Sequence, residues 1–152
     1  MQNIAFLASD AGPAQQALVR LVGLYGTVPV DRADVIVALG GDGFMLQTLH
    51  QHEARALPVY GMNCGTIGFL MNEYEEGGLQ DRLQATVINP LRMRTVGADG
   101  SKQDALAINE VALLRAGPQA AKLRISVDGR VRMDELVCDG APTTWLVKRQ
   151  VR

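Results

Sequence analysis

Three glycines surround one carboxylate at residues 40–43, which read Gly-Gly-Asp-Gly. The motif follows a β-branched apolar run at residues 35–39 and precedes a helical pattern at residues 44–53. Glycine loses more backbone entropy on folding than other residues, but it lets the backbone approach a ligand closely. Backbone N–H groups at a helix N-terminus favour anions such as phosphate. Asp42, placed beside them, is therefore a candidate general base or metal ligand.

The same motif also fits a structural interpretation, in which Asp42 is the N-cap of a helix after a tight turn. It does not match a Walker A loop, because no Lys-Ser/Thr pair follows, nor does it match Gly-x-Gly-x-x-Gly. A second glycine-spaced loop, at residues 63–70, also follows a predicted strand. Binding sites in open α/β sheets lie outside the carboxyl ends of strands. The two loops are therefore predicted to line one crevice, or else to be two unrelated turns.

The elements that position these loops alternate along the first part of the chain. Apolar runs predict buried strands at residues 4–8, 34–39 and 58–62, and helical spacing predicts helices at residues 14–25, 44–53 and 73–86. This order predicts an α/β fold, with a Rossmann-like parallel-sheet domain at residues 1–90. Beyond it the pattern has period two, and an Asp-Gly pair predicts an antiparallel hairpin at residues 123–133.

Composition excludes several classes of function. The net charge of -1 offers no general attraction to nucleic acid or to an anionic membrane. No apolar run approaches the roughly 20 residues of a membrane span, and the apolar N-terminus lacks a basic leader, so a buried strand is expected there rather than a signal peptide. Cys64 and Cys138 are too far apart in sequence for a Cys-x-x-Cys zinc or redox motif. We expect a reduced, cytoplasmic protein.

Other polar residues carry weaker signals when taken alone. Asn109 and Glu110 lie between apolar neighbours, where they are suited to hold a ribose hydroxyl or a base edge, or to occupy an exposed strand position. Asp139 precedes Gly140 and alone reads as a turn residue.

Taken together, these motifs resemble the NAD kinase family, which phosphorylates NAD with ATP to give NADP. The resemblance rests on Gly-Gly-Asp-Gly, the loop Asn-Cys-Gly-Thr-Ile-Gly-Phe-Leu at residues 63–70, the Asn109-Glu110 pair, and Asp-Glu-Leu-Val-Cys-Asp-Gly at residues 134–140. It covers about residues 1–140 and is strongest to short bacterial enzymes, especially alphaproteobacterial ones. Diacylglycerol and sphingosine kinases share the first motif, but the Asn-Glu pair and the absence of a membrane-facing stretch count against a lipid kinase.

The resemblance implies roles for the first domain. Asp42 would take the proton from the 2′-hydroxyl of the adenosine ribose of NAD. Gly43 and its neighbours would bring backbone N–H groups to the phosphates, and Phe69 would pack near the bound dinucleotide. Mg²⁺ or another divalent metal would bridge the ATP phosphates, as in phosphoryl transfer generally.

The resemblance also implies roles for the second part of the chain. Asn109 and Glu110 would hydrogen-bond NAD, and Asp139 would contact NAD from across a subunit boundary, since the full-length family implies a homo-oligomer. Lys122 lies near a position that is basic or His in relatives, and it is carried over as a nucleotide-binding candidate.

The sequence departs from the family pattern near its end. Family members continue after Cys-Asp-Gly with Thr-Pro-x-Gly-Ser-Thr-Ala-Tyr and a long β-rich stretch, whereas this sequence differs from Pro142 onward. We therefore expect a truncation or frameshift, with the first part of a β-rich NAD-binding domain at residues 91–141 and an aberrant tail at residues 142–152. Such an incomplete antiparallel β domain leaves a marginal hairpin with an exposed apolar face. The function is then that of an impaired NAD kinase, or of a non-catalytic nucleotide-binding remnant.

Overall fold

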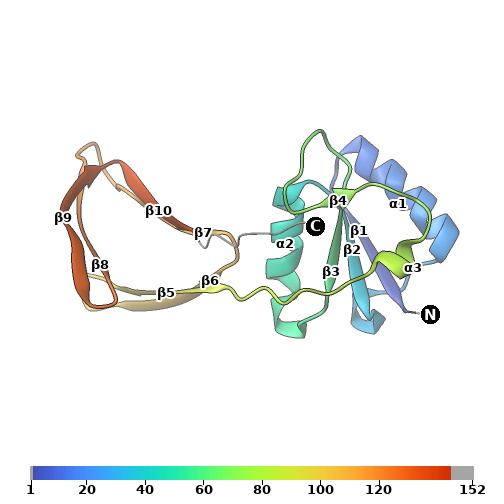
Figure 1. Ribbon diagram of the computed structural model, residues 1–152, viewed down its shortest axis with the longest axis horizontal. Helices are drawn as coiled ribbons and strands as arrows, with labels where there is room; N and C mark the ends of the chain where they lie inside the picture. The colour runs from blue at the N-terminus through green and yellow to red at the C-terminus, as the bar shows by residue number, and fades with distance from the viewer. Residues whose placement is uncertain (1, 145–152) are drawn as a thin grey trace. The chain divides into compact units, whose positions relative to one another are not determined.

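The computed structural model describes residues 2–144, and the chain divides into two compact units, Met1–Val87 and Ile88–Arg152. The first unit is a parallel sheet with helices, and the second consists of antiparallel strand pairs (Figure 1). This confirms the predicted fold class, an α/β domain followed by antiparallel β structure. Within residues 2–144, no helix has both the length and the apolar character needed to cross a membrane.

A four-stranded parallel sheet forms the centre of the first unit, in the order β1-β2-β3-β4. The elements of this unit are β1 (Ile4–Ala8), α1 (Gly12–Tyr25), η1 (Val30–Arg32), β2 (Val35–Gly40), α2 (Asp42–His52), η2 (Glu53–Arg55), β3 (Val59–Asn63), β4 (Asn72–Glu73) and α3 (Leu79–Arg82). The three long strands lie within one or two residues of their predicted positions. The short strand β4 was not predicted.

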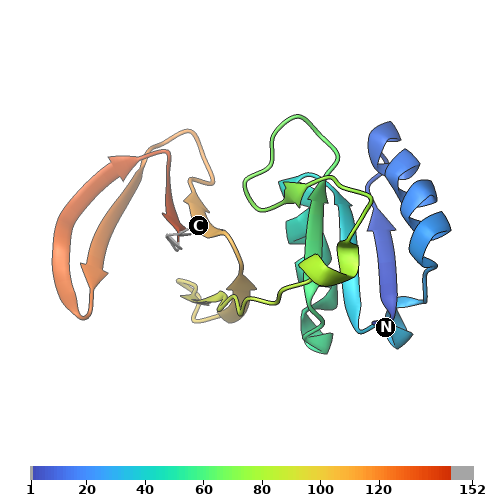
Figure 2. The same ribbon diagram turned by 45° about the vertical axis from the view of Figure 1, so that its right-hand side comes forward.

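Strand β2 is buried along its whole length, as a strand covered on both faces must be. Val37 and Leu39 belong to a core cluster with Leu21 of α1. Ala38 instead packs with Met45 of α2. Because successive side chains of a strand point to opposite faces, α1 and α2 cover opposite faces of the sheet (Figure 2).

The predicted helix at residues 73–86 is wrong, because only α3 is helical in this stretch. Two glycines, Gly77 and Gly78, precede α3, and Gly78 adopts a left-handed conformation with φ of 64°. Glycine is a poor helix former because of its backbone entropy. The apolar spacing that suggested a long helix reflects Leu79 and Leu83 packing against the core from an irregular segment.

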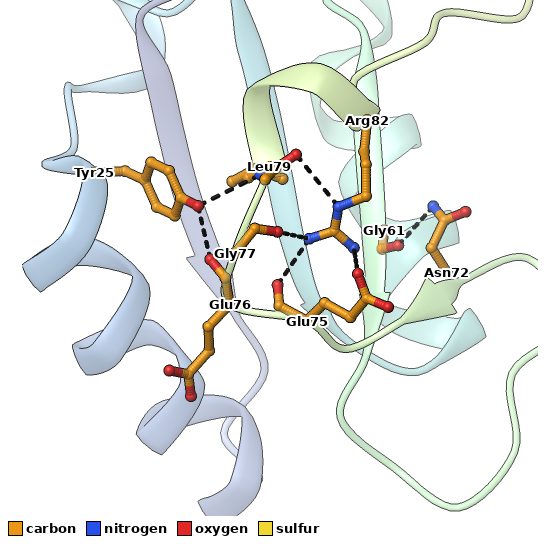
Figure 3. Close-up of polar contacts among 9 residues, drawn as sticks. Tyr25, Gly61, Asn72, Glu75, Glu76, Gly77, Leu79 and Arg82 are labelled. Atoms are coloured by element: carbon orange, nitrogen blue, oxygen red, sulfur yellow. Dashed lines mark hydrogen bonds and ion pairs between the residues drawn. The ribbon is translucent and has the colours of Figure 1, made fainter.

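Side chains hold this irregular segment in place (Figure 3). The Arg82 guanidinium donates to the carbonyl oxygens of Glu75 and Gly77, at 3.0 and 2.8 Å, and forms a 2.7 Å ion pair with the Glu75 carboxylate. The Tyr25 hydroxyl donates to the carbonyl oxygen of Glu76 at 2.7 Å and accepts the Leu79 N–H at 3.4 Å. Side-chain contacts therefore replace the backbone hydrogen bonds that a long helix would have made.

Within residues 88–144, the second unit forms three two-stranded antiparallel sheets, β5–β6, β8–β9 and β7–β10. Its strands are β5 (Leu91–Val96), β6 (Lys102–Ala107), β7 (Glu110–Leu114), β8 (Ala121–Val127), β9 (Arg130–Cys138) and β10 (Gly140–Thr144). The predicted hairpin is confirmed and extends further at both ends. Asp128 and Gly129 both have positive φ, 52° and 72°, as a type I′ turn requires.

Strand β10 begins where the sequence was expected to leave the family pattern. Pro142 lies opposite Ala112, and Thr143 opposite Val111, in the β7–β10 pair. Proline is tolerated in a strand with a free edge because it needs no ladder partner for its nitrogen. The first residues of the predicted tail are thus in a strand, and residues 145–152 lie outside the described part of the chain.

Burial separates the two units sharply. All fully buried hydrophobic side chains within residues 2–144 belong to the first unit. Many large apolar side chains of the second unit are exposed, among them Leu106, Leu113, Leu114, Val131, Met133 and Val137. This agrees with the expected exposure of the apolar hairpin face.

Candidate functional site

The glycine motif forms the turn between β2 and α2. Gly41 is the N-cap residue, with extended backbone angles and no side-chain cap, and its carbonyl accepts the Met45 N–H at 3.1 Å. A Cβ atom on Gly40 would lie only 3.0 Å from the Cβ of Phe44. Glycine at position 40 therefore allows the helix to start close to the end of the strand.

Asp42 is the first helical residue and not the N-cap, so that alternative is wrong. Its carboxylate points instead to the second glycine-spaced loop. Oδ2 accepts the Phe69 N–H at 2.9 Å, while Oδ1 accepts the N–H groups of Phe69 and Leu70 at 3.1 and 2.9 Å. The two loops thus meet in one place, as one of the two alternatives predicted.

Electrostatics favours this arrangement. The positive end of the α2 dipole stabilises a carboxylate in the first turn, and hydrogen bonds to an ionised acceptor are stronger than those between neutral groups. The beginning of the loop is also fixed to the glycine motif, because the Cys64 N–H donates to the carbonyl oxygen of Gly40 at 2.8 Å. Burial raises the pKa of the Cys64 thiol, and a backbone hydrogen bond involving Gly40 partly opposes that effect.

The surroundings of Asp42 combine an anchored carboxylate with open space. Asp42 is half-buried, whereas Gly43 is exposed and has no atom within 4 Å of the position a Cβ would take. The Phe69 side chain is 80% exposed. A ligand therefore has access to the first turn of α2 and to the ring of Phe69.

The candidate residues of the second unit lie on its strand pairs. Asn109 precedes β7 and Glu110 begins it, and both are exposed. Asp139 directly precedes β10 at the opposite end of the same pair, since Gly140 lies opposite Leu114. Four residue steps along β7 separate the two ends by about 13 Å. The strand pair therefore does not bring Glu110 and Asp139 together.

Two of the three charged candidates in this unit, Asp139 and Lys122, already have partners. The Asp139 carboxylate forms a 2.7 Å ion pair with Arg115, whose N–H also donates to the Asp139 carbonyl oxygen at 3.0 Å. Lys122, on β8, forms an exposed 3.6 Å ion pair with Glu135. Exposed pairs of this kind contribute about 0–1 kcal/mol, so a ligand can compete for either side chain.

Asn63, to which no role was assigned from the sequence, ends β3 and is the first residue of the loop at residues 63–70. Its Oδ1 accepts the Gly65 N–H at 3.0 Å. Beside it lies a hollow of about 280 Å³ that includes Arg20 and Tyr74 in its lining. In the sequence, Asn63 was visible only as the first residue of the glycine-spaced loop motif, directly after an apolar run.

No group of three or more His, Cys, Asp or Glu side chains within residues 2–144 is arranged to hold a metal ion. The described residues therefore do not fit a metal site built by protein side chains alone.

Comparison with known proteins finds a match to the stretch that contains both glycine-spaced loops. The family profile of the ATP-NAD kinase N-terminal domain matches residues 24–86. NAD kinase of Cereibacter sphaeroides is 59% identical over 143 residues, covering 92% of this chain and 56% of that protein. NAD kinases of Caulobacter vibrioides and Rhizobium meliloti are 57% and 52% identical, over 91% of this chain and 55% of each protein. The chain therefore spans about half the length of these curated relatives. At this identity and coverage, the chain belongs to the NAD kinase family.

Proposed function

We propose that the chain carries the machinery that phosphorylates NAD on the 2′-hydroxyl of its adenosine ribose, with ATP as donor and NADP and ADP as products. Membership of the NAD kinase family supports the substrates. The observation that carries the proposal for this chain is the Asp42 carboxylate, anchored by two backbone N–H groups at the start of α2.

Asp42 acts as the general base in this proposal. Each carboxylate oxygen has two lone pairs, and among the described residues Oδ2 accepts only the N–H of Phe69. Oδ2 therefore keeps capacity for the ribose 2′-hydroxyl. Asp42 takes the hydroxyl proton as the oxygen attacks the γ-phosphorus, and the bond between the γ-phosphorus and the β,γ-bridging oxygen breaks to release ADP. Because the carboxylate is already held in place, less conformational entropy is lost when the transition state forms.

The first turn of α2 binds phosphate groups in this proposal. Its N–H groups and helix dipole favour an anion, and α2 is 11 residues long. The open space around Gly43 leaves room for a phosphate to reach the backbone. Phe69, whose ring is largely exposed, packs against the dinucleotide and shields the reacting groups from water.

The second unit contributes contacts to NAD. Asn109 and Glu110 provide a carboxamide and a carboxylate for ribose or base hydrogen bonds, and Lys122 provides a positive charge. Asp139 lies at the far end of the β7–β10 pair from Glu110. This separation supports a homo-oligomer in which Asp139 contacts NAD held by a neighbouring subunit.

A divalent cation, in this proposal, is bound by the ATP phosphates, which are its preferred oxygen ligands. The described residues do not fit a separate metal site. We assign no step to the cation.

A direct assay tests the proposal. NADP formation from NAD and ATP is measured with this chain, with Asp42→Asn, and with a version extended through the Gly-Ser-Thr-Ala-Tyr motif of the family. Turnover that depends on Asp42 supports the proposed reaction. Absence of turnover in both the short and the extended chain contradicts it.

The site also supports a second candidate, a nucleotide-binding module without catalysis, because a ligand has access to the first turn of α2 and to the ring of Phe69. Calorimetric titration with NAD separates the two functions. Binding by the short chain without turnover, together with turnover by the extended chain, assigns this second function to the chain as it stands.

A further inference from the structure

We infer that Asn63 is a positioning residue for Asp42, acting through the loop that joins them. The inference rests on the proposed role of Asp42 as general base. Asn63 and Asp42 both bind the backbone of the loop, at its two ends, and the Asn63 side chain lies against Gly65 and Gly68.

The first contact is at the start of the loop. Asn63 Oδ1 accepts the Gly65 N–H at 3.0 Å, which turns the chain away from the direction of β3. A Cβ on Gly65 would lie 3.5 Å from the same oxygen. The carboxamide therefore contacts the backbone of the loop directly after the strand.

The second contact is on the returning side of the loop. A Cβ on Gly68 would lie 3.2 Å from Asn63 Cγ and 3.2 Å from Met71 Cβ. Glycine at 68 therefore lets the returning backbone close onto the Asn63 side chain. The next two residues, Phe69 and Leu70, then present their N–H groups to Asp42.

These contacts give the Asn63 side chain a defined consequence. With Asn63 present, the loop has a fixed turn at Gly65 and a side chain against Gly68, and its two donor N–H groups are directed at the carboxylate. Without the carboxamide, the Gly65 N–H loses its acceptor and Gly68 loses that contact. The loop then samples conformations in which the carboxylate of Asp42 is not held, so the base is less often oriented toward a ribose hydroxyl.

Hydrogen exchange of the Phe69 and Leu70 amides, followed by NMR in the full chain, tests this inference without requiring turnover. Asn63→Ala is expected to speed exchange at both amides about tenfold, the effect of losing a hydrogen bond, while the amides of β2 remain protected. Asn63→Asp keeps an acceptor oxygen and is expected to restore the slow exchange. Asn72→Ala is the matched control, because Asn72 Nδ2 donates to the carbonyl oxygen of Gly61 at 3.0 Å and does not bind the loop.

A double-mutant cycle adds a second readout. Asn63→Ala and Asp42→Asn are expected to be non-additive in their effect on exchange, since both act on the same loop. Unchanged exchange in Asn63→Ala, equally fast exchange in Asn63→Asp, or strict additivity would overturn the inference. Where turnover is measurable, Asn63→Ala is expected to lower kcat about tenfold with little change in KM. A lack of turnover in the unmodified and extended chains would instead contradict the proposed function, and the exchange data would still decide the role of Asn63.

Discussion

The carboxylate of Asp42 lies 2.9 Å from the backbone N–H of Phe69, although 27 residues separate them in sequence. This contact joins the turn after β2 to the loop after β3 at the carboxyl edge of the sheet. One side chain in the first turn of α2 therefore orders a neighbouring loop. The same carboxylate is the proposed general base, so the contact that orders the loop also holds the base in place.

Removing the Asp42 carboxylate should destabilise the first unit. Asp42→Ala leaves the N–H groups of Phe69 and Leu70 without their acceptor, and hydrogen bonds to charged groups contribute roughly 1.5–3 kcal/mol. We expect a loss of about 1–3 kcal/mol in urea unfolding. The control is Asp10→Ala, since Asp10 is exposed in the turn before α1. Equal effects of the two substitutions would contradict the proposed contact.

A methyl group at Gly61 should force two buried methionine side chains to move. A Cβ there would overlap the sulfur of Met71 and lie 3.1 Å from the sulfur of Met45. We expect Gly61→Ala to lower stability by about 1–3 kcal/mol, as overpacking of a core does. Gly23→Ala is the matched control, because Gly23 lies within α1 with open space around it. Alanine there should stabilise the helix by about 0.5–1 kcal/mol, and thermal unfolding of both variants measures the difference.

The Tyr25 hydroxyl should be needed to fix the segment before α3. Tyr25→Phe leaves the carbonyl of Glu76 without its donor and removes an acceptor from Leu79. The expected cost is about 1–2 kcal/mol, with faster tryptic cleavage after Arg82. Tyr60→Phe serves as control, since the Tyr60 hydroxyl makes no hydrogen bond among the described residues. If Arg82 stays equally resistant to trypsin, the segment does not depend on Tyr25.

Acid should weaken the contact between α1 and the segment at Glu76. Hydrogen bonds from Arg20 and then Tyr74 hold the pKa of Glu76 below its ordinary value of 4.5. A carboxyl whose folded-state pKa is depressed stabilises the fold above its unfolded pKa, and this contribution is lost as pH falls through the folded pKa. Between pH 6 and pH 3, the Tm of the unmodified chain should therefore fall more than the Tm of Glu76→Gln. Parallel pH profiles of Tm would show that the ion pair with Arg20 contributes nothing measurable.

In the Asp128-Gly129 turn, position 128 should tolerate glycine, whereas position 129 should not tolerate a β-branched side chain. Gly129 has φ of 72°, and a β-branched residue is strongly disfavoured in that region. We expect Gly129→Val to disrupt the cross-strand NMR contacts of β8 and β9. Asp128→Gly should preserve them, because glycine adopts the positive φ of position 128 at no steric cost. Loss of the hairpin in both variants would show that the Asp128 side chain matters more than the backbone angle.

The sequence predicted those parts of the fold in which one signal dominated. The buried strands were visible as apolar runs, and the hairpin at Asp128-Gly129 was visible as turn chemistry. The helix expected at residues 73–86 failed because Arg82 and Tyr25 bind backbone groups of a segment that apolar spacing alone cannot distinguish from a helix.

For the candidate site, the sequence singled out residues but not the contacts between them. Asp42 and the loop containing Phe69 were both identified, with the meeting of the two loops as one alternative. An N-cap carboxylate and a carboxylate that accepts N–H groups from a distant loop occur in the same sequence pattern. Only the structure shows which of these two roles Asp42 has. Asn63 was missed because its contact depends on the path of the loop around it.

The two kinds of sheet also imply different folding times. The β8–β9 hairpin pairs residues within the stretch 121–138, whereas the β1–β2 pair joins Ile4 to Val35 across a helix. Hairpins form in about 1–10 μs, and pairings between distant segments form more slowly because a longer loop must close first. The hairpin, whose Met133 and Val137 stay exposed, can therefore form before the parallel sheet is complete, although by itself it is marginally stable. During that interval a nascent chain can associate with other chains through this surface, so concentration during refolding should affect the yield of folded protein.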